Sequence, residues 1–130
     1  MNKELENKNA VTIPHVGKIG EVQIADEVVA IIAGLAATEV KGVVSMNGNI
    51  TNELVGKLGM KNLSKGVKVS FAPESVTVYL ALTLEYGYSI PKTSKLVQER
   101  VKLAIENMTG LTVAEVNIRI AGVNTNNTTV

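Results

Sequence analysis

KGVKVSFAPESVTVYLALTLEYGYSIP, residues 65–91, decides the fold of this 130-residue chain. Apolar and polar residues alternate through two runs of this stretch, with the period of two that is typical of strands with one buried face. The apolar positions are Val67, Val69 and Phe71 in the first run and Val76, Val78, Leu80, Leu82, Leu84 and Tyr86 in the second. Turn-forming residues at 72–75 separate the runs, so we predict an antiparallel hairpin that forms the wall of the core.

A long helix is predicted after this hairpin. Gly87 interrupts the alternation, Ser89 is a favourable N-cap residue, and Pro91 is tolerated in a first helical turn. Apolar residues then recur at three- and four-residue spacing, which places them on one face of a helix that ends before Gly110. They are Val97, Val101, Ala104, Ile105 and Met108. Residues 113–121 are predicted to form the last strand, because apolar positions alternate again.

A second helix is predicted before the hairpin, over residues 25–40. This segment is apolar on nearly every side, which indicates a helix that is deeply buried. Asp26 suits its N-terminus, through the helix dipole or as a cap, and Gly42 is expected to end it.

Shorter elements are expected around this helix. Residues 17–24 predict a strand in which Val22 and Ile24 face inward, and residues 43–46 predict another short strand. Residues 47–65 are expected to form a loop that contains one short helix.

The expected fold is therefore a single α+β domain, a mixed β-sheet with two main helices on one face, in the order β-α-β-(short α)-β-β-α-β. Residues 1–16 are expected to be a flexible leader, 17–123 the domain, and 124–130 a polar flexible tail. Eight apolar residues are expected to be buried together in its core: Val69, Val78, Leu80, Leu82, Val101, Ile105, Ile118 and Ile120.

Composition argues against several classes of function. Thirteen Lys and Arg against twelve Asp and Glu leave a formal net charge of +1, whereas nucleic-acid binders are usually strongly basic. The absence of cysteine excludes disulfides and cysteine-ligated zinc. Because there is no secretory signal and no apolar run of roughly 18 to 20 residues, we expect a protein that stays inside the cell and does not insert into the membrane.

No catalytic constellation can be drawn from the sequence. Asp26 is the only aspartate and His15, in the expected leader, is the only histidine. Neither a Ser-His-Asp set nor a pair of catalytic carboxylates can be assembled from them. We therefore expect no enzyme activity and no metal or cofactor.

Six ordered motifs resemble the bacterial alkaline shock protein family, the envelope stress response proteins of Gram-positive bacteria. The motifs are GKIGEVQIADEVV (17–29), AATEVKGV (36–43), KGVKV (65–69), EYGYSIP (85–91), VQERVK (97–102) and MTGLTVAEVNIRIAGV (108–123). The resemblance implies a cytoplasmic, non-enzymatic protein of cell-envelope homeostasis. Some members of the family form assemblies and are held near the membrane by a separate anchoring protein, so the resemblance implies these properties as expectations for this chain.

Two classes of function remain open. The first is a self-associating scaffold or adaptor, whose partners would be further copies of the chain and a membrane-anchored bacterial protein. Its candidate self-association face consists of the outward residues of the second strand, Thr77, Tyr79, Ala81 and Thr83.

A candidate partner contact follows that strand at Tyr86, Tyr88 and Ser89. Alternation places Tyr86 on the buried face, whereas Tyr88 comes after the break at Gly87 and is expected to point outward. Tyrosine is favoured at interfaces because it combines a large apolar surface with a hydroxyl group.

The alternative is a small module that binds nucleic acid or another ligand. Sheets that bind RNA normally present several aromatic side chains for stacking, and here only Tyr79 is expected on the outward face. Nucleic acid is therefore not the expected partner.

Overall fold

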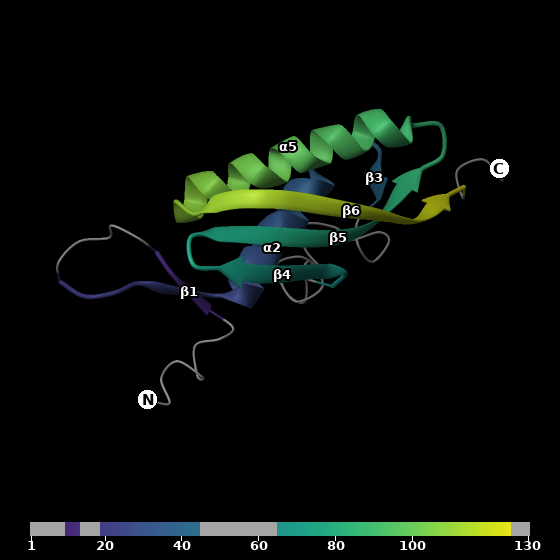
Figure 1. Cartoon of the computed structure of the whole chain (residues 1–130). Helices are drawn as coiled ribbons and strands as arrows, with labels where there is room; N and C mark the ends of the chain where they lie inside the picture. Colours follow the sequence, from purple (N-terminus) through teal and green to yellow (C-terminus); the bar gives the residue numbers. More distant parts are fainter. Residues whose placement is uncertain (1–9, 14–18, 45–64, 126–130) are drawn as a thin grey trace.

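The computed structural model describes residues 10–13, 19–44 and 65–125. Its elements are β1 (Ala10–Thr12), β2 (Gln23–Ala25), α2 (Asp26–Thr38), β3 (Val43–Val44), β4 (Val67–Ala72), β5 (Ser75–Glu85), α5 (Ile90–Thr109) and β6 (Thr112–Asn124). Figure 1 shows a layer of strands with α2 and α5 on one side of it. The predicted α+β class and the two helices on one face are confirmed. The short helix expected within 47–65 lies outside the described residues, apart from Lys65 in a turn.

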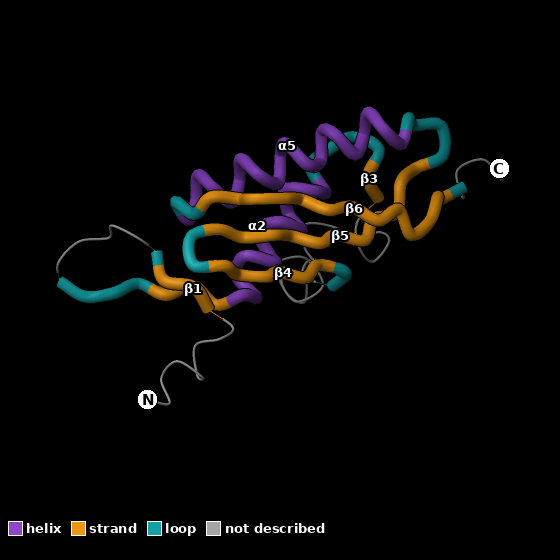
Figure 2. The backbone as a smooth tube through the Cα atoms, in the orientation of Figure 1, coloured by secondary structure: helices purple, strands orange, loops and turns teal. Residues whose placement is uncertain are grey.

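β5 is the central strand of the main sheet. β6 runs parallel to it along one edge, from Ser75↔Thr112 to Glu85↔Asn124. β4 and β3 pair with the other edge in succession, both antiparallel, and the β4 register places Val69 opposite Val78. Figure 2 shows the three long strands side by side. The sheet is therefore mixed, and the predicted antiparallel hairpin is confirmed.

The core lies between this sheet and the two helices. The inward residues of β5 are at most 2% exposed, and they are Val76, Val78, Leu80, Leu82 and Leu84. Val97, Val101 and Ile105 of α5 are fully buried with them. The other three expected core residues, Val69, Ile118 and Ile120, are only partly buried, because they lie on the strands that flank β5.

Met108 was expected on the buried stripe of α5, and this expectation is wrong, because its side chain is 71% exposed. The buried positions of α5 recur strictly every four residues, at Thr93, Val97, Val101, Ile105 and Thr109. Four residues advance an α-helix by about 400°, so this line drifts by about 40° at each step. By the last turn the sheet-facing direction has moved away from Met108.

α2 is less deeply buried than its composition predicts. Val28 and Leu35 are exposed, on a side of α2 that an open hollow separates from α5. The acidic residues Asp26 and Glu27 lie in the first turn, as expected, but the N-cap is Ala25 and makes no side-chain cap. The helix ends before Gly42, with Glu39 as its C-cap.

The ends of α5 confirm the predicted caps. The Ser89 Oγ accepts a hydrogen bond from the Lys92 N–H at 3.4 Å, and proline occupies the first turn. At the other end Gly110 adopts a left-handed conformation with φ 77°. Its N–H donates to the Glu106 carbonyl at 2.9 Å.

The N-terminal region differs from the expectation of a leader without regular structure. β1 pairs antiparallel with β2, and Val11, opposite Ile24, is buried in the core. The expectation that Val22 faces inward is wrong, because its side chain is exposed. β2 begins only at Gln23, so Val22 precedes the strand and the alternation does not apply to it.

Replacement of Leu80 tests this core. Leu80→Ala should lower the free energy of unfolding by about 2 to 5 kcal/mol, because it leaves a cavity beneath both helices. Leu96→Ala on the exposed side of α5 is the matched control, with an expected loss below about 1 kcal/mol. Equal midpoints for the two variants in denaturant melts would show that Leu80 is not a core residue.

Candidate functional site

The main sheet has one face that no helix of the described residues covers. Strand register brings its outward residues into rows, such as Ser70–Thr77–Glu115 and Lys68–Tyr79–Asn117. Directly paired residues point to the same side of a sheet. We call this surface the open sheet face, and it consists of Lys68, Ser70, Thr77, Tyr79, Ala81, Thr83, Glu115, Asn117 and Arg119.

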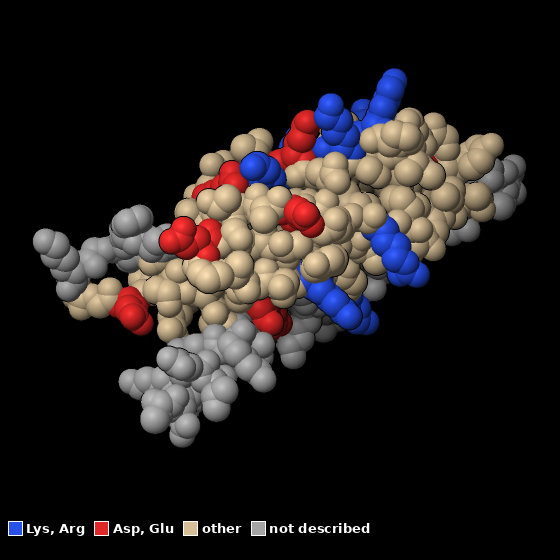
Figure 3. Space-filling view, viewed as in Figure 1, with Lys and Arg blue, Asp and Glu red and all other residues tan. Residues whose placement is uncertain are grey.

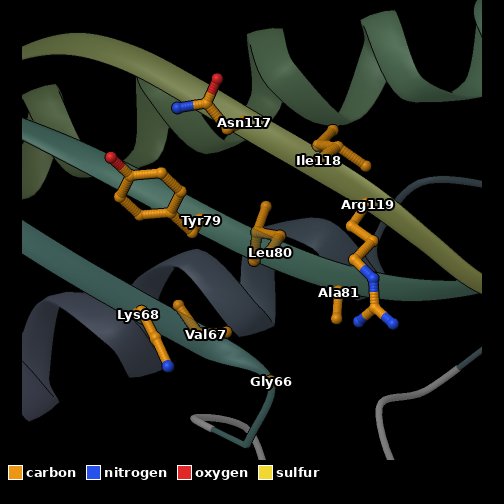
Figure 4. Close-up of a pocket in the computed structure, with 9 residues that line it drawn as sticks. All are labelled: Gly66, Val67, Lys68, Tyr79, Leu80, Ala81, Asn117, Ile118 and Arg119. Carbon is orange, nitrogen blue, oxygen red and sulfur yellow. The ribbon is translucent and has the colours of Figure 1, made fainter.

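A hollow of ≈ 460 Å³ lies in the middle of the open sheet face, as Figure 4 shows. Its lining residues are Gly66, Val67, Lys68, Tyr79, Leu80, Ala81, Asn117, Ile118 and Arg119. Ala81 donates its N–H to the Gly66 carbonyl at 2.9 Å, which holds the two strands together at this level. Because alanine and glycine have almost no side chain, the surface is low here. Figure 4 shows Ala81 between the Tyr79 ring and the Arg119 guanidinium.

The charges of the hollow are all positive. Lys68 and Arg119 line it, and no acidic side chain does. Glu115 lies one row away, where its Oε1 accepts a hydrogen bond from the Asn117 Nδ2 at 3.2 Å. Figure 3, in the orientation of Figure 1, shows that uncharged residues make up most of this side of the molecule.

All four residues of the candidate self-association face lie on the open sheet face. Tyr79 is 48% exposed, while Thr77, Ala81 and Thr83 are half-buried between the flanking strands. Sequence alternation identified these residues, since they occupy one strand. It missed Lys68, Asn117 and Arg119, which belong to the same site through the register of two other strands.

The three residues of the candidate partner contact lie at the corner between β5 and α5 but have different environments. The expectation that Tyr86 is buried is wrong, because its side chain is 66% exposed. β5 ends at Glu85, so the alternation no longer applies to Tyr86, whose N–H donates to the Asn124 carbonyl at 3.1 Å. Ser89 serves as the cap of α5.

Tyr88 is 41% exposed and packs its ring on the backbone of Gly42. A Cβ atom at Gly42 would lie 2.6 Å from the Tyr88 Cδ2, and Gly42 has a φ of 98°, so glycine is required there on two grounds. The expected outward projection of Tyr88 is therefore only partial. Tyr86 is the freer of the two tyrosines.

A second hollow, of ≈ 420 Å³, lies on the opposite side of the domain between α2 and α5. It is lined by Val28, Ile31, Ile32, Leu35, Ala36, Glu39, Ala104 and Met108. Sequence analysis missed it because it treated α2 as buried on all sides. The available signal was that a helix lying on one sheet beside one other helix cannot cover apolar residues around its whole circumference.

Neither metal ligands nor a membrane span can be found in the described part of the chain. No group of three or more His, Cys, Asp or Glu residues gathers within 10–13, 19–44 and 65–125. Neither α2 nor α5 has the length and hydropathy of a segment that crosses a membrane. His15 lies outside the described residues.

Comparison with known proteins gives a consistent set of relatives. A model of the alkaline shock protein 23 family, described as having a cell envelope-related function, matches residues 15–125. The uncharacterized protein YqhY of Bacillus subtilis strain 168 is 43% identical over 105 residues, which cover 81% of this chain and 78% of YqhY. YloU, an uncharacterized protein of the same strain, is 34% identical over 85% of this chain and 93% of its own length.

Two more distant matches extend this set. A stress response regulator gls24 homolog of Streptococcus pyogenes serotype M3 is 30% identical over 82% of this chain, and the match covers 60% of that relative. Among solved structures, a MamM CTD variant superposes over 75% of this chain and 94% of its own with a TM-score of 0.44 and 13% identity. This structural likeness is too weak to support a common function.

Replacing each tyrosine of the corner tests which of the two contributes to the stability of the fold. Tyr88→Ala should lower the free energy of unfolding by about 1 to 2 kcal/mol, because the ring no longer covers the Gly42 backbone. Tyr86→Ala is the matched control and should change it by less than about 0.5 kcal/mol. A thermal melt in which Tyr86→Ala is the more destabilised variant would contradict this assignment.

Proposed function

Because the chain belongs to the alkaline shock protein 23 family, whose function is related to the cell envelope, we propose that it is a non-enzymatic scaffold of the envelope stress response. In this proposal the chain associates with further copies of itself through the open sheet face. The relative named as a stress response regulator supports the link to stress.

The observation that carries the proposal is the character of the open sheet face. A sheet face that remains in water usually alternates strongly polar residues with the buried ones. Here the central strand presents Thr77, Tyr79, Ala81 and Thr83, which carry no charge. Tyrosine is enriched and charged residues are depleted at the centre of protein interfaces. This composition favours a surface that another protein covers.

The proposal includes a second contact at the corner, through which the scaffold would meet a membrane-anchored bacterial protein. Tyr86 supports this role because it is the most exposed tyrosine and lies on a corner held by the Ser89 cap. Such an adaptor would work inside the cell close to the membrane. The absence of cysteine and the envelope-related family function support this location.

A module that binds single-stranded nucleic acid or a small anionic ligand is the second candidate. The observation that favours it is that Lys68 and Arg119 line the same hollow as Tyr79. Nucleic-acid grooves combine positive charge with several stacking side chains. Tyr79 is the only aromatic residue of the open sheet face, so we rank this function below self-association.

Two added charges should separate the proposed assembly into monomers. In the Thr77→Lys, Thr83→Lys double variant, like charges would be buried against each other across the contact, which is costly when they lose water. Light scattering should report the mass of one chain, with an unchanged circular dichroism spectrum. Glu99→Lys, which changes the charge by the same two units on α5, should leave the mass of the assembly unchanged. An unchanged mass for the double variant would exclude this face.

The corner is tested with the membrane fraction of the native organism. Tyr86→Ala should reduce capture of an anchored partner at least about tenfold, the loss typical of a hot-spot tyrosine. The variant should keep its own assembly, because Tyr86 lies outside the open sheet face. Capture equal to that of the parent chain would remove the corner from the proposal.

A further inference from the structure

We propose that two copies of the chain pack open face against open face, with Tyr79 of each copy inserted into the hollow beside Ala81 of the other. This inference rests on the proposed self-association and assigns its geometry and contacts. The contact is isologous, so each copy contributes the same surface. Both the projecting group and the cavity that receives it are present on every copy.

Shape complementarity is the first argument. Tyr79 and Ala81 are two residues apart on β5, and a strand advances about 3.3 Å per residue, so the projection and the hollow are about 6.6 Å apart. Consider a two-fold axis that lies between the two sheets, perpendicular to β5 and level with Leu80. This axis brings Tyr79 of each copy over Ala81 of the other. Sheets that pack face to face are separated by about 10 Å. A tyrosine side chain spans most of that gap and would reach the low surface at Ala81.

Charge selects this axis over its neighbours. An axis at the level of Tyr79 would place Lys68 against Lys68 of the second copy, because Lys68 lies in the same row as Tyr79. An axis at the level of Ala81 would place Arg119 against Arg119 for the same reason. The axis at Leu80 instead places Arg119 opposite Asn117 and Lys68 near Gly66 of the second copy. No like charges then face each other directly.

The same axis gives Arg119 two favourable neighbours. The inserted Tyr79 ring lies beside it, in the adjacent strand of the row, where a guanidinium interacts favourably with an aromatic ring. Glu115 of the second copy falls one row from Arg119. Arg119 of each copy therefore forms an ion pair with Glu115 of the other, which gives two symmetric ion pairs. The hydrogen bond from Asn117 holds the Glu115 carboxylate on this face.

A pair of reversed charges tests the geometry. Glu115→Arg and Arg119→Glu should each raise the dissociation constant of the parent assembly at least about tenfold, because each variant places like charges together. When the two single variants are mixed, both ion pairs again join opposite charges, one as in the parent and one reversed, so the mixed pair should associate with an affinity close to that of the parent. Light scattering and sedimentation of the separate and mixed variants measure this.

The inserted side chain is tested independently. Tyr79→Ala, which removes the projection, and Ala81→Phe, which fills the hollow, should each raise the dissociation constant at least about tenfold. Lys95→Glu and Glu99→Arg on α5 are the controls for charge and should have no effect, alone or mixed. Denaturant melts of each variant establish that it remains folded.

The outcomes distinguish the two levels of the proposal. A parent chain that stays a monomer at millimolar concentration would overturn both the self-association and its geometry. A parent that assembles, while the mixed Glu115→Arg and Arg119→Glu variants stay apart, would overturn the geometry and leave the self-association standing. Association of the mixed variants, together with its loss in Tyr79→Ala, is the result that we expect.

Discussion

The two-sided residue pattern of β5 is the constraint on which the rest of the structure depends. Its inward residues are buried against the helices, and its outward residues form the centre of the open sheet face. A slip of one residue in pairing would exchange the two sets, exposing Leu80 and burying Tyr79. The two-residue turn at Pro73 and Glu74 and the helical crossover between β5 and β6 fix this register from both sides.

The contacts of α5 favour the face of the sheet over its edge as the place for a partner. Among the described strands β6 pairs only with β5, so its outer edge is a potential site for another strand. The Gln98 Nε2 donates to the Val116 carbonyl at 3.0 Å, and the Val113 N–H donates to the Glu106 Oε2 at 2.9 Å. These side chains satisfy backbone groups of β6 and hinder the addition of a strand there.

Irregularities in the ladder further define the usable surface. Register shifts occur between Val76 and Thr77 and again between Leu82 and Thr83. Bulges increase the local twist of a sheet, whereas the stretch of β5 between the two shifts keeps a regular register. Tyr79 and Ala81 lie in that stretch, where a second sheet could approach.

The sequence predicts the long elements because their signals are local. Alternation, the Ser89 cap and the left-handed Gly110 belong to single segments, and so does membership of the open sheet face along β5. The hollow depends on the alignment of three strands, and the bulges that set this alignment have no simple sequence signature. Met108 and Tyr86 were misassigned because periodicity does not reveal how far a buried line drifts or where pairing stops.

Along β5, the residues that stabilise the fold alternate with the residues that are available for association. Leu80 and Leu82 are buried under the helices, whereas Tyr79 and Ala81, their immediate neighbours, contribute to the surface. A change at an outward position therefore alters the surface without removing core volume. The limit of this independence lies at the corner, where the Tyr88 ring covers the Gly42 backbone just before β3. A partner that displaced Tyr88 would disturb the end of the sheet, whereas one that bound Tyr86 would leave it intact, so Tyr86 is the position at which a contact least affects the fold.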